Sequence, residues 1–242
     1  MSSTPVRASI TAATFLAQNR GGGLYSESLS QRAGAYLALG AYRLRWSPSA
    51  VTITALVIGV GASVALVVLA PRTATGGVPA LVTGLAVGLG WQLAYALDCA
   101  DGQLARVTGR ASANGARLDI LCDVAVQISV IAGIVAVTAA NTPRTPAWLY
   151  AAFAGTWMVN LVTSALASGP ASASLIAARS PVARVVKLVR DYGAVVAVCA
   201  LVIALAPGWT VWLLVVMSVI NGLFLVASIA QAARAAFSHT NS

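Results

Sequence analysis

The sequence predicts an all-α polytopic membrane protein, with six transmembrane helices that follow an amphipathic juxtamembrane helix. Of its 242 residues, 59% are hydrophobic and only 9% are charged, whereas soluble domains carry about 25% charged residues. The mean hydropathy of +0.84 agrees with this imbalance. Six long apolar segments divide the chain, and backbone groups in lipid must pair within their own segment, so each segment is predicted to be a helix.

Most of these segments reach the roughly 20 residues that cross the hydrocarbon core of a bilayer. Ser47 and Pro48 suit the N-cap and the first turn of the first helix, and Pro71 is expected to end it. The fifth segment is short, and we expect it to extend into residues 183–191. The segments cover residues 49–70, 79–97, 119–140, 147–168, 192–206 and 209–230.

Four regions follow from this pattern. Residues 1–26 are polar, basic and Gly-rich and are expected to be flexible, without the continuous apolar core of a cleavable signal peptide. Residues 27–46 place apolar side chains at helical spacing beside arginines, which predicts an amphipathic helix on the membrane surface. Residues 47–236 hold the six-helix membrane domain, and residues 237–242 form a tail.

The basic residues predict the orientation of the chain in the cell membrane. With six spans, both termini share one side, and that side receives thirteen of the fifteen Lys and Arg residues, whereas only Arg72 and Arg144 fall on the other. Because cytoplasmic loops collect basic residues, both termini are predicted to be cytoplasmic. The net charge of +9 is therefore explained by topology. Nucleic-acid binding is not expected, because it would need a solvated basic face.

Four of the six acidic residues fall within 26 positions, at the inner ends of the second and third segments. Asp98 and Asp101 are three residues apart, Asp119 and Asp123 four, so each pair lies on one helix face. Carboxylates grouped at a membrane are costly unless cations neutralise them. Because no histidine or cysteine ligand spacing accompanies them, their hard oxygens suit Mg²⁺ or Mn²⁺ rather than zinc.

Small residues and one arginine surround these acids. Gly102, Ala105 and Gly115 allow a ligand or a backbone to approach closely, and Arg106 offers a bidentate donor for phosphate. Metal ions, an arginine and an open groove together indicate a pyrophosphate site, at which catalysis depends mainly on positioning and charge neutralisation.

The motif resembles the signature of the CDP-alcohol phosphotransferase family, D-x2-D-G-x2-A-R-x8-G-x3-D-x3-D, at every specified position. It begins at Asp98 and ends at Asp123. The six-span layout and the preceding surface helix are also similar to the family, so the resemblance covers about residues 27–236. It implies an enzyme of phospholipid biosynthesis that transfers a phosphoalcohol from a CDP-linked donor to an alcohol and releases CMP.

The resemblance also implies roles for the acids. Asp98, Asp101 and Asp119 would bind two Mg²⁺ or Mn²⁺ ions. Asp123 would be a metal ligand or a neighbour of one, and also the general base that deprotonates the acceptor hydroxyl.

Further roles concern the donor. Gly102, Ala105 and Gly115 would line the cytidine pocket, with Arg106 near the phosphates. Thr52 would help to hold the nucleotide, at a place where the family often has Pro-Asn-x-x-Thr and this chain has Ser in place of Asn.

Two functions from different classes stay open at this point. The first is phosphotransfer from CDP-diacylglycerol, or from a soluble CDP-alcohol, to inositol phosphate, glycerol phosphate, serine or another polar alcohol. The second is a cation-coupled transporter that uses the intramembrane aspartates, although transporter sites usually lie near the midplane.

Two other features have alternative interpretations. A second basic group would capture a phosphorylated acceptor, or would only contact anionic membrane lipids. Gly84 and Gly88 form a GxxxG motif that packs helices within the chain or between two chains of a homodimer. The second basic group consists of Arg179, Arg184, Lys187 and Arg190.

Overall fold

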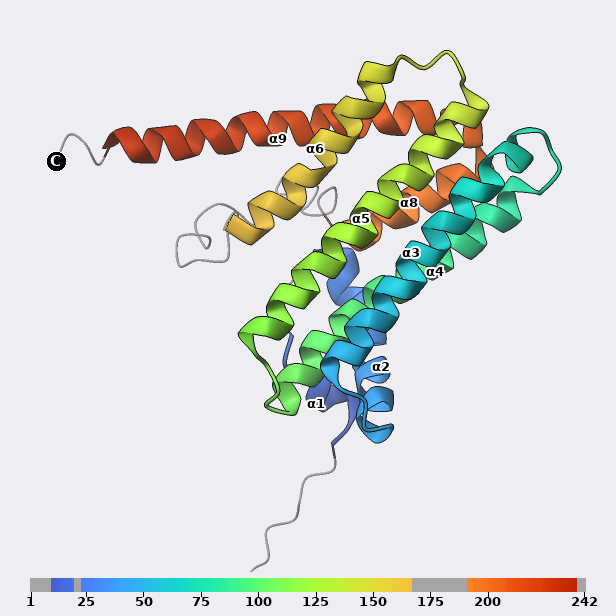
Figure 1. Cartoon of the computed structure of the whole chain (residues 1–242). Helices are drawn as coiled ribbons and strands as arrows, with labels where there is room; N and C mark the ends of the chain where they lie inside the picture. The colour runs from blue at the N-terminus through green and yellow to red at the C-terminus, as the bar shows by residue number, and fades with distance from the viewer. Residues whose placement is uncertain (1–9, 20–22, 167–190, 239–242) are drawn as a thin grey trace, which may run out of the picture.

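The computed structural model describes residues 10–19, 23–166 and 191–238, which form helices and contain no β-strand. A short helix and a π-helical turn precede the long helices, and a 3₁₀ turn joins the last two (Figure 1). The elements are α1 (Ala12–Leu16), η1 (Ser26–Ser30), α2 (Gln31–Arg43), α3 (Pro48–Ala74), α4 (Ala80–Val107), α5 (Ala113–Asn141), α6 (Ala147–Leu166), α8 (Tyr192–Leu205), η3 (Pro207–Trp209) and α9 (Thr210–Ser238).

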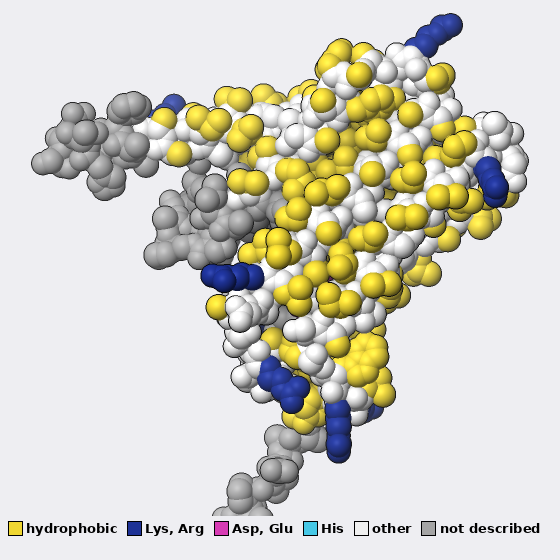
Figure 2. Space-filling view, in the orientation of Figure 1, with side chains coloured by type: hydrophobic (Ala, Val, Ile, Leu, Met, Phe, Trp, Pro, Cys, Tyr) yellow, Lys and Arg dark blue, Asp and Glu magenta, His cyan; other side chains and the backbone are white. Residues whose placement is uncertain are grey.

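The all-helical prediction is confirmed for these residues. Within them, four helices are long and apolar enough to cross a membrane, namely α3, α4, α5 and the helix that contains α9, whereas α6 and α8 provide shorter apolar stretches. Hydrophobic side chains cover the middle of the face seen in Figure 2, and the arginine side chains visible on it lie toward its edges. The expected extension into residues 183–191 lies almost wholly outside the described residues, and α8 itself begins at Tyr192.

Helix α3 begins as predicted but ends later. The Ser47 side chain accepts a hydrogen bond from the Ala50 amide at 3.2 Å, which caps the helix start. The prediction that Pro71 ends the helix was wrong, because α3 continues to Ala74. The end of the helix is set by Gly76, whose φ of +78° suits glycine. The amide of Gly77 then donates a hydrogen bond to the Arg72 carbonyl at 2.8 Å, as in a Schellman motif.

The GxxxG motif packs within the chain, against α8. A methyl group at Gly84 would lie 2.5 Å from the Ala204 backbone nitrogen, and one at Gly88 would lie 2.6 Å from the Ala200 Cβ. The two glycines therefore allow α4 and α8 to approach closely. Of the two interpretations of this motif, the structure supports packing within one chain.

The long helices share one core, and the N-terminal elements share a smaller one. Helices α3, α4, α5 and α8 lie together in the bundle, while α6 pairs with α9 (Figure 1). The N-terminal elements pack against the C-terminal half of α4. There Phe15 of α1 is fully buried, and Gly34 of α2 leaves no room for a side chain against the Ala96 carbonyl. This packing places residues 23–31 beside the end of α4 that carries Asp98 and Asp101.

Candidate active site

The structure brings three of the four aspartates together between α4 and α5. Asp98 and Asp101 stand about one turn apart near the end of α4, and Asp119 lies in the second turn of α5. Each offers a carboxylate oxygen, and these oxygens all lie within 4.8 Å of one another. Helix α3 packs against both helices and covers one side of the group.

This group has the chemistry of a divalent-cation site. Three carboxylates held at this distance repel one another in a low-dielectric setting, and a bound cation removes that repulsion. One oxygen, Asp119 Oδ1, is buried without a hydrogen-bond partner, and buried polar atoms normally have one. Hard oxygen ligands suit Mg²⁺ or Mn²⁺, so the residues present fit such ions.

Thr52 holds one of the three carboxylates in place. Its hydroxyl donates a hydrogen bond of 2.5 Å to Asp101 Oδ2, and both residues are buried. The donor comes from the second turn of α3, directly after the Ser47 cap. Thr52 thus contacts a candidate metal ligand, which places it at the predicted site and orients the Asp101 side chain.

A Thr52→Val substitution is therefore expected to weaken metal activation about tenfold, because removing a partner of a ligand usually costs 10- to 100-fold in metal affinity or activity. Titration of Mn²⁺ with the purified protein measures this. Thr54→Val is the matched control, because the Thr54 hydroxyl donates to the Ala50 carbonyl of its own helix. Equal metal affinity in the Thr52 variant and the control would contradict the role of Thr52.

Arg106 lies against the same acids. Its guanidinium folds over Gly102, where a methyl group would approach Nη1 to 3.0 Å. Its Nε donates a hydrogen bond to the Gln18 carbonyl at 2.9 Å. Its positive charge favours the ionised form of the Asp119 carboxylate. The predicted Ala105 is half-buried on the same helix. Gly115 lies in the first turn of α5, where its amide donates a hydrogen bond to the Ser112 hydroxyl oxygen at 3.1 Å.

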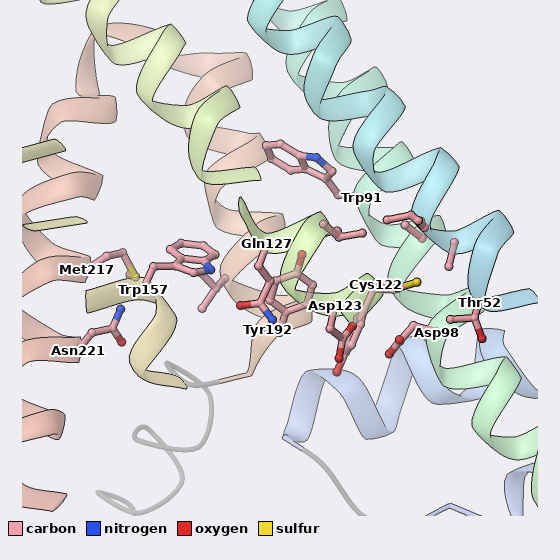
Figure 3. A pocket seen from close by; sticks show the side chains of 16 residues that line it. Thr52, Trp91, Asp98, Cys122, Asp123, Gln127, Trp157, Tyr192, Met217 and Asn221 are labelled. Atoms are coloured by element: carbon pink, nitrogen blue, oxygen red, sulfur yellow. The ribbon is translucent and has the colours of Figure 1, made fainter. Parts of the chain in front are cut away.

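A cavity of about 220 Å³ opens beside the acids and runs into the helix bundle. Asp98 and Asp123 line one end of it, so Asp98 belongs both to the cavity and to the three-carboxylate group. Figure 3 shows Gln127 and Tyr192 near Asp123, and Trp157, Met217 and Asn221 farther along. Asp123 is not one of the three grouped carboxylates, but it faces the space that a substrate can enter.

Several cavity residues were not singled out by the sequence analysis. Tyr95 precedes Asp98 by three residues and Gln127 follows Asp123 by four, so each shares a helix face with a motif aspartate. Both line the cavity, together with Tyr192 of α8. One signal in the sequence could have identified them. Each is a polar residue inside an apolar segment, and such residues in a membrane helix indicate a functional site.

The second basic group cannot be placed. Arg179, Arg184, Lys187 and Arg190 lie outside the described residues. The next residue, Asp191, is buried and accepts hydrogen bonds from Ser26, whose amide lies 2.8 Å away. Burial and the nearby Asp191 carboxylate raise the pKa of Tyr25.

The chain matches a known protein family. A family model for CDP-alcohol phosphatidyltransferase matches residues 45–221, a range that includes Thr52, all four motif aspartates and Asp191. A search of curated proteins finds no match.

Proposed function

Because the chain belongs to the CDP-alcohol phosphatidyltransferase family, we propose that it transfers a phosphatidyl group from CDP-diacylglycerol to a polar alcohol and releases CMP. The observation that carries this proposal is the group of three carboxylates with oxygens within 4.8 Å, which shares Asp98 with a cavity that Asp123 also lines. The group suits a metal-bound diphosphate, and the adjoining cavity suits an acceptor.

The membrane arrangement forms part of the proposal. Six spans, counting α6 and α8 with the four long helices, would put both termini and the active site on the cytoplasmic side. Residues 27–46 would lie along the membrane surface, and residues 47–236 would form the catalytic domain. The strong bias of basic residues toward one set of connections supports this orientation.

Donor binding would involve residues on both sides of the α4–α5 connection. Asp98, Asp101 and Asp119 would hold two Mg²⁺ or Mn²⁺ ions, and Asp123 would hold or adjoin one. When bound, these ions would supply the positive charge that neutralises the diphosphate and the departing CMP. Arg106 would add a donor for the phosphates, and Gly102, Ala105 and Gly115 would leave room for cytidine.

The transfer itself would begin at Asp123. Its carboxylate takes the proton of the acceptor hydroxyl, and the acceptor oxygen forms a bond to the phosphorus distal to cytidine. The bond between that phosphorus and the bridging oxygen breaks, and the electron pair leaves with CMP. Asp98 lines the cavity together with Asp123, so the base would lie beside the reacting phosphate.

The acceptor is proposed to be a phosphorylated polyol, either inositol phosphate or glycerol phosphate. Tyr95, Gln127 and Tyr192 give the cavity several hydrogen-bonding groups, which suit the hydroxyls of a polyol. Arg179, Arg184, Lys187 and Arg190 would bind the phosphate of such an acceptor.

The proposal predicts that the purified protein releases CMP from CDP-diacylglycerol only when Mg²⁺ or Mn²⁺ and a suitable alcohol are both present. The assay compares inositol phosphate, glycerol phosphate and serine, each with and without chelator, and soluble CDP-alcohols are tested as alternative donors. CMP release that is insensitive to chelator, or absent with every donor and acceptor in the panel, would contradict the proposal.

A further inference from the structure

Asp191 joins three parts of the chain that are far apart in sequence. Its carboxylate accepts hydrogen bonds from the amide of Ser26, at 2.8 Å, and from the hydroxyl of the same residue. The Ser26 hydroxyl in turn lies 2.8 Å from the Tyr95 hydroxyl. The N-terminal turn η1, helix α4 and the start of α8 are thereby linked through two hydroxyl groups.

The chemistry of the carboxylate fixes the direction of this chain of hydrogen bonds. An ionised carboxylate only accepts, and a serine hydroxyl has a single proton to donate. Because Ser26 gives its proton to Asp191, its oxygen must accept from Tyr95. The Tyr95 proton is therefore directed at Ser26, and the Tyr95 oxygen keeps only acceptor capacity for any other partner.

Tyr95 is also a residue of the active-site cavity. It lines the cavity together with Asp98 and Asp123, and its ring meets the ring of Tyr192 edge to face with centroids 5.1 Å apart. The aspartates that adjoin this tyrosine are also acceptors when ionised. A ligand beside Tyr95 thus meets a hydrogen-bond acceptor from the tyrosine, and this fits a ligand hydroxyl that donates.

The packing around Asp191 leaves little room for other arrangements. Asp191 is 4% exposed, and a methyl group at Gly23 would collide with its carboxylate. A methyl group at Gly193 would lie 2.9 Å from both Tyr25 and Tyr95, and the Gly193 carbonyl accepts from Gln92 at 2.8 Å. These contacts hold the Tyr95 ring between η1 and α8.

We propose that Asp191 is a positioning residue that, through Ser26, fixes Tyr95 as a hydrogen-bond acceptor for a hydroxyl group of the acceptor alcohol. This inference rests on the proposed function, and it adds to that function a residue that selects the acceptor. The carboxylate acts through the tyrosine and does not touch the substrate. Donor binding, which depends on the carboxylates of the motif, does not require it.

A double-mutant cycle tests the coupling. Tyr95→Phe removes the acceptor oxygen, and Asp191→Asn keeps the side-chain size but can donate to Ser26 and reverse the chain. Each single variant is expected to raise the acceptor KM about five- to tenfold, as the loss of one hydrogen bond does, with little change in the donor KM. The double variant is expected to be no worse than the more severe single variant, because both changes disable one group. Tyr150→Phe, on α6 and outside the cavity residues, is the control for tyrosine substitution.

Additive effects in the double variant, or an unchanged acceptor KM in either single variant, would overturn the inference. A second measurement does not need turnover. Hydrogen exchange of the peptide that contains residues 23–31 should accelerate in Asp191→Ala and stay unchanged in Tyr150→Phe, since the Ser26 amide loses its acceptor. Unchanged exchange in Asp191→Ala would refute the link between Asp191 and Ser26. If the wild-type protein releases no CMP, the proposed function fails instead, and the exchange result still decides whether the link exists.

Discussion

Replacing Asp123 with Asn is expected to reduce turnover by about 10²–10⁴-fold, the usual contribution of a general base. Asparagine keeps the shape of the side chain but cannot take the proton of the acceptor hydroxyl. Asp123 lines the cavity but is not one of the three grouped carboxylates. The variant should therefore still bind a CDP-linked donor in the presence of Mn²⁺, with an affinity close to that of the wild-type protein.

Two measurements on the Asp123→Asn variant separate the possible outcomes. Single-turnover release of CMP reports the chemical step, and equilibrium binding of a CDP-alcohol with and without Mn²⁺ reports the donor site. Turnover near the wild-type rate would exclude Asp123 as the base. Loss of metal-dependent donor binding would show instead that Asp123 is needed as a metal ligand.

The second large effect is expected at Asp119. Its Oδ1 atom is buried without a hydrogen-bond partner and belongs to a residue of the three-carboxylate group. Asp119→Asn removes the charge and should lower activity by about 100-fold or more, with loss of metal-dependent donor binding. Activity measured across a Mg²⁺ and Mn²⁺ titration tests this. The same metal activation curve in the variant and the wild-type protein would contradict the assignment.

The two aspartate variants control for each other. Both replace an aspartate of α5 with asparagine, four residues apart on one helix face. We expect Asp123→Asn to keep metal-dependent donor binding and Asp119→Asn to lose it. Identical behaviour of the two variants would remove the distinction between base and ligand.

Much of the site could be predicted because its information is local. The spacing of Asp98 from Asp101, and of Asp119 from Asp123, fixes which side chains share a helix face. A short connection makes the two helices neighbours. In the structure, carboxylate oxygens of Asp98, Asp101 and Asp119 do lie together across these two helices. The start of α3 was predictable for the same reason, because Ser47 and Pro48 are local signals.

What could not be predicted depends on contacts between distant segments. Ser26 and Asp191 are 165 positions apart, and no local pattern pairs a polar N-terminal turn with the N-cap residue of a later helix. The GxxxG motif indicated close packing but did not name α8 as the partner. The prediction for Pro71 was wrong because α3 holds this proline inside its last turn, and the positive φ of Gly76 determines where the helix ends.

The most direct test of the account is to count the metal ions at the three-carboxylate group. Electron paramagnetic resonance of the purified chain with Mn²⁺ and a CDP-alcohol should show two ions close enough to couple magnetically. The coupled signal should disappear in Asp119→Asn. If the wild-type protein binds no Mn²⁺ under conditions in which it releases CMP, these carboxylates do not form the proposed metal site.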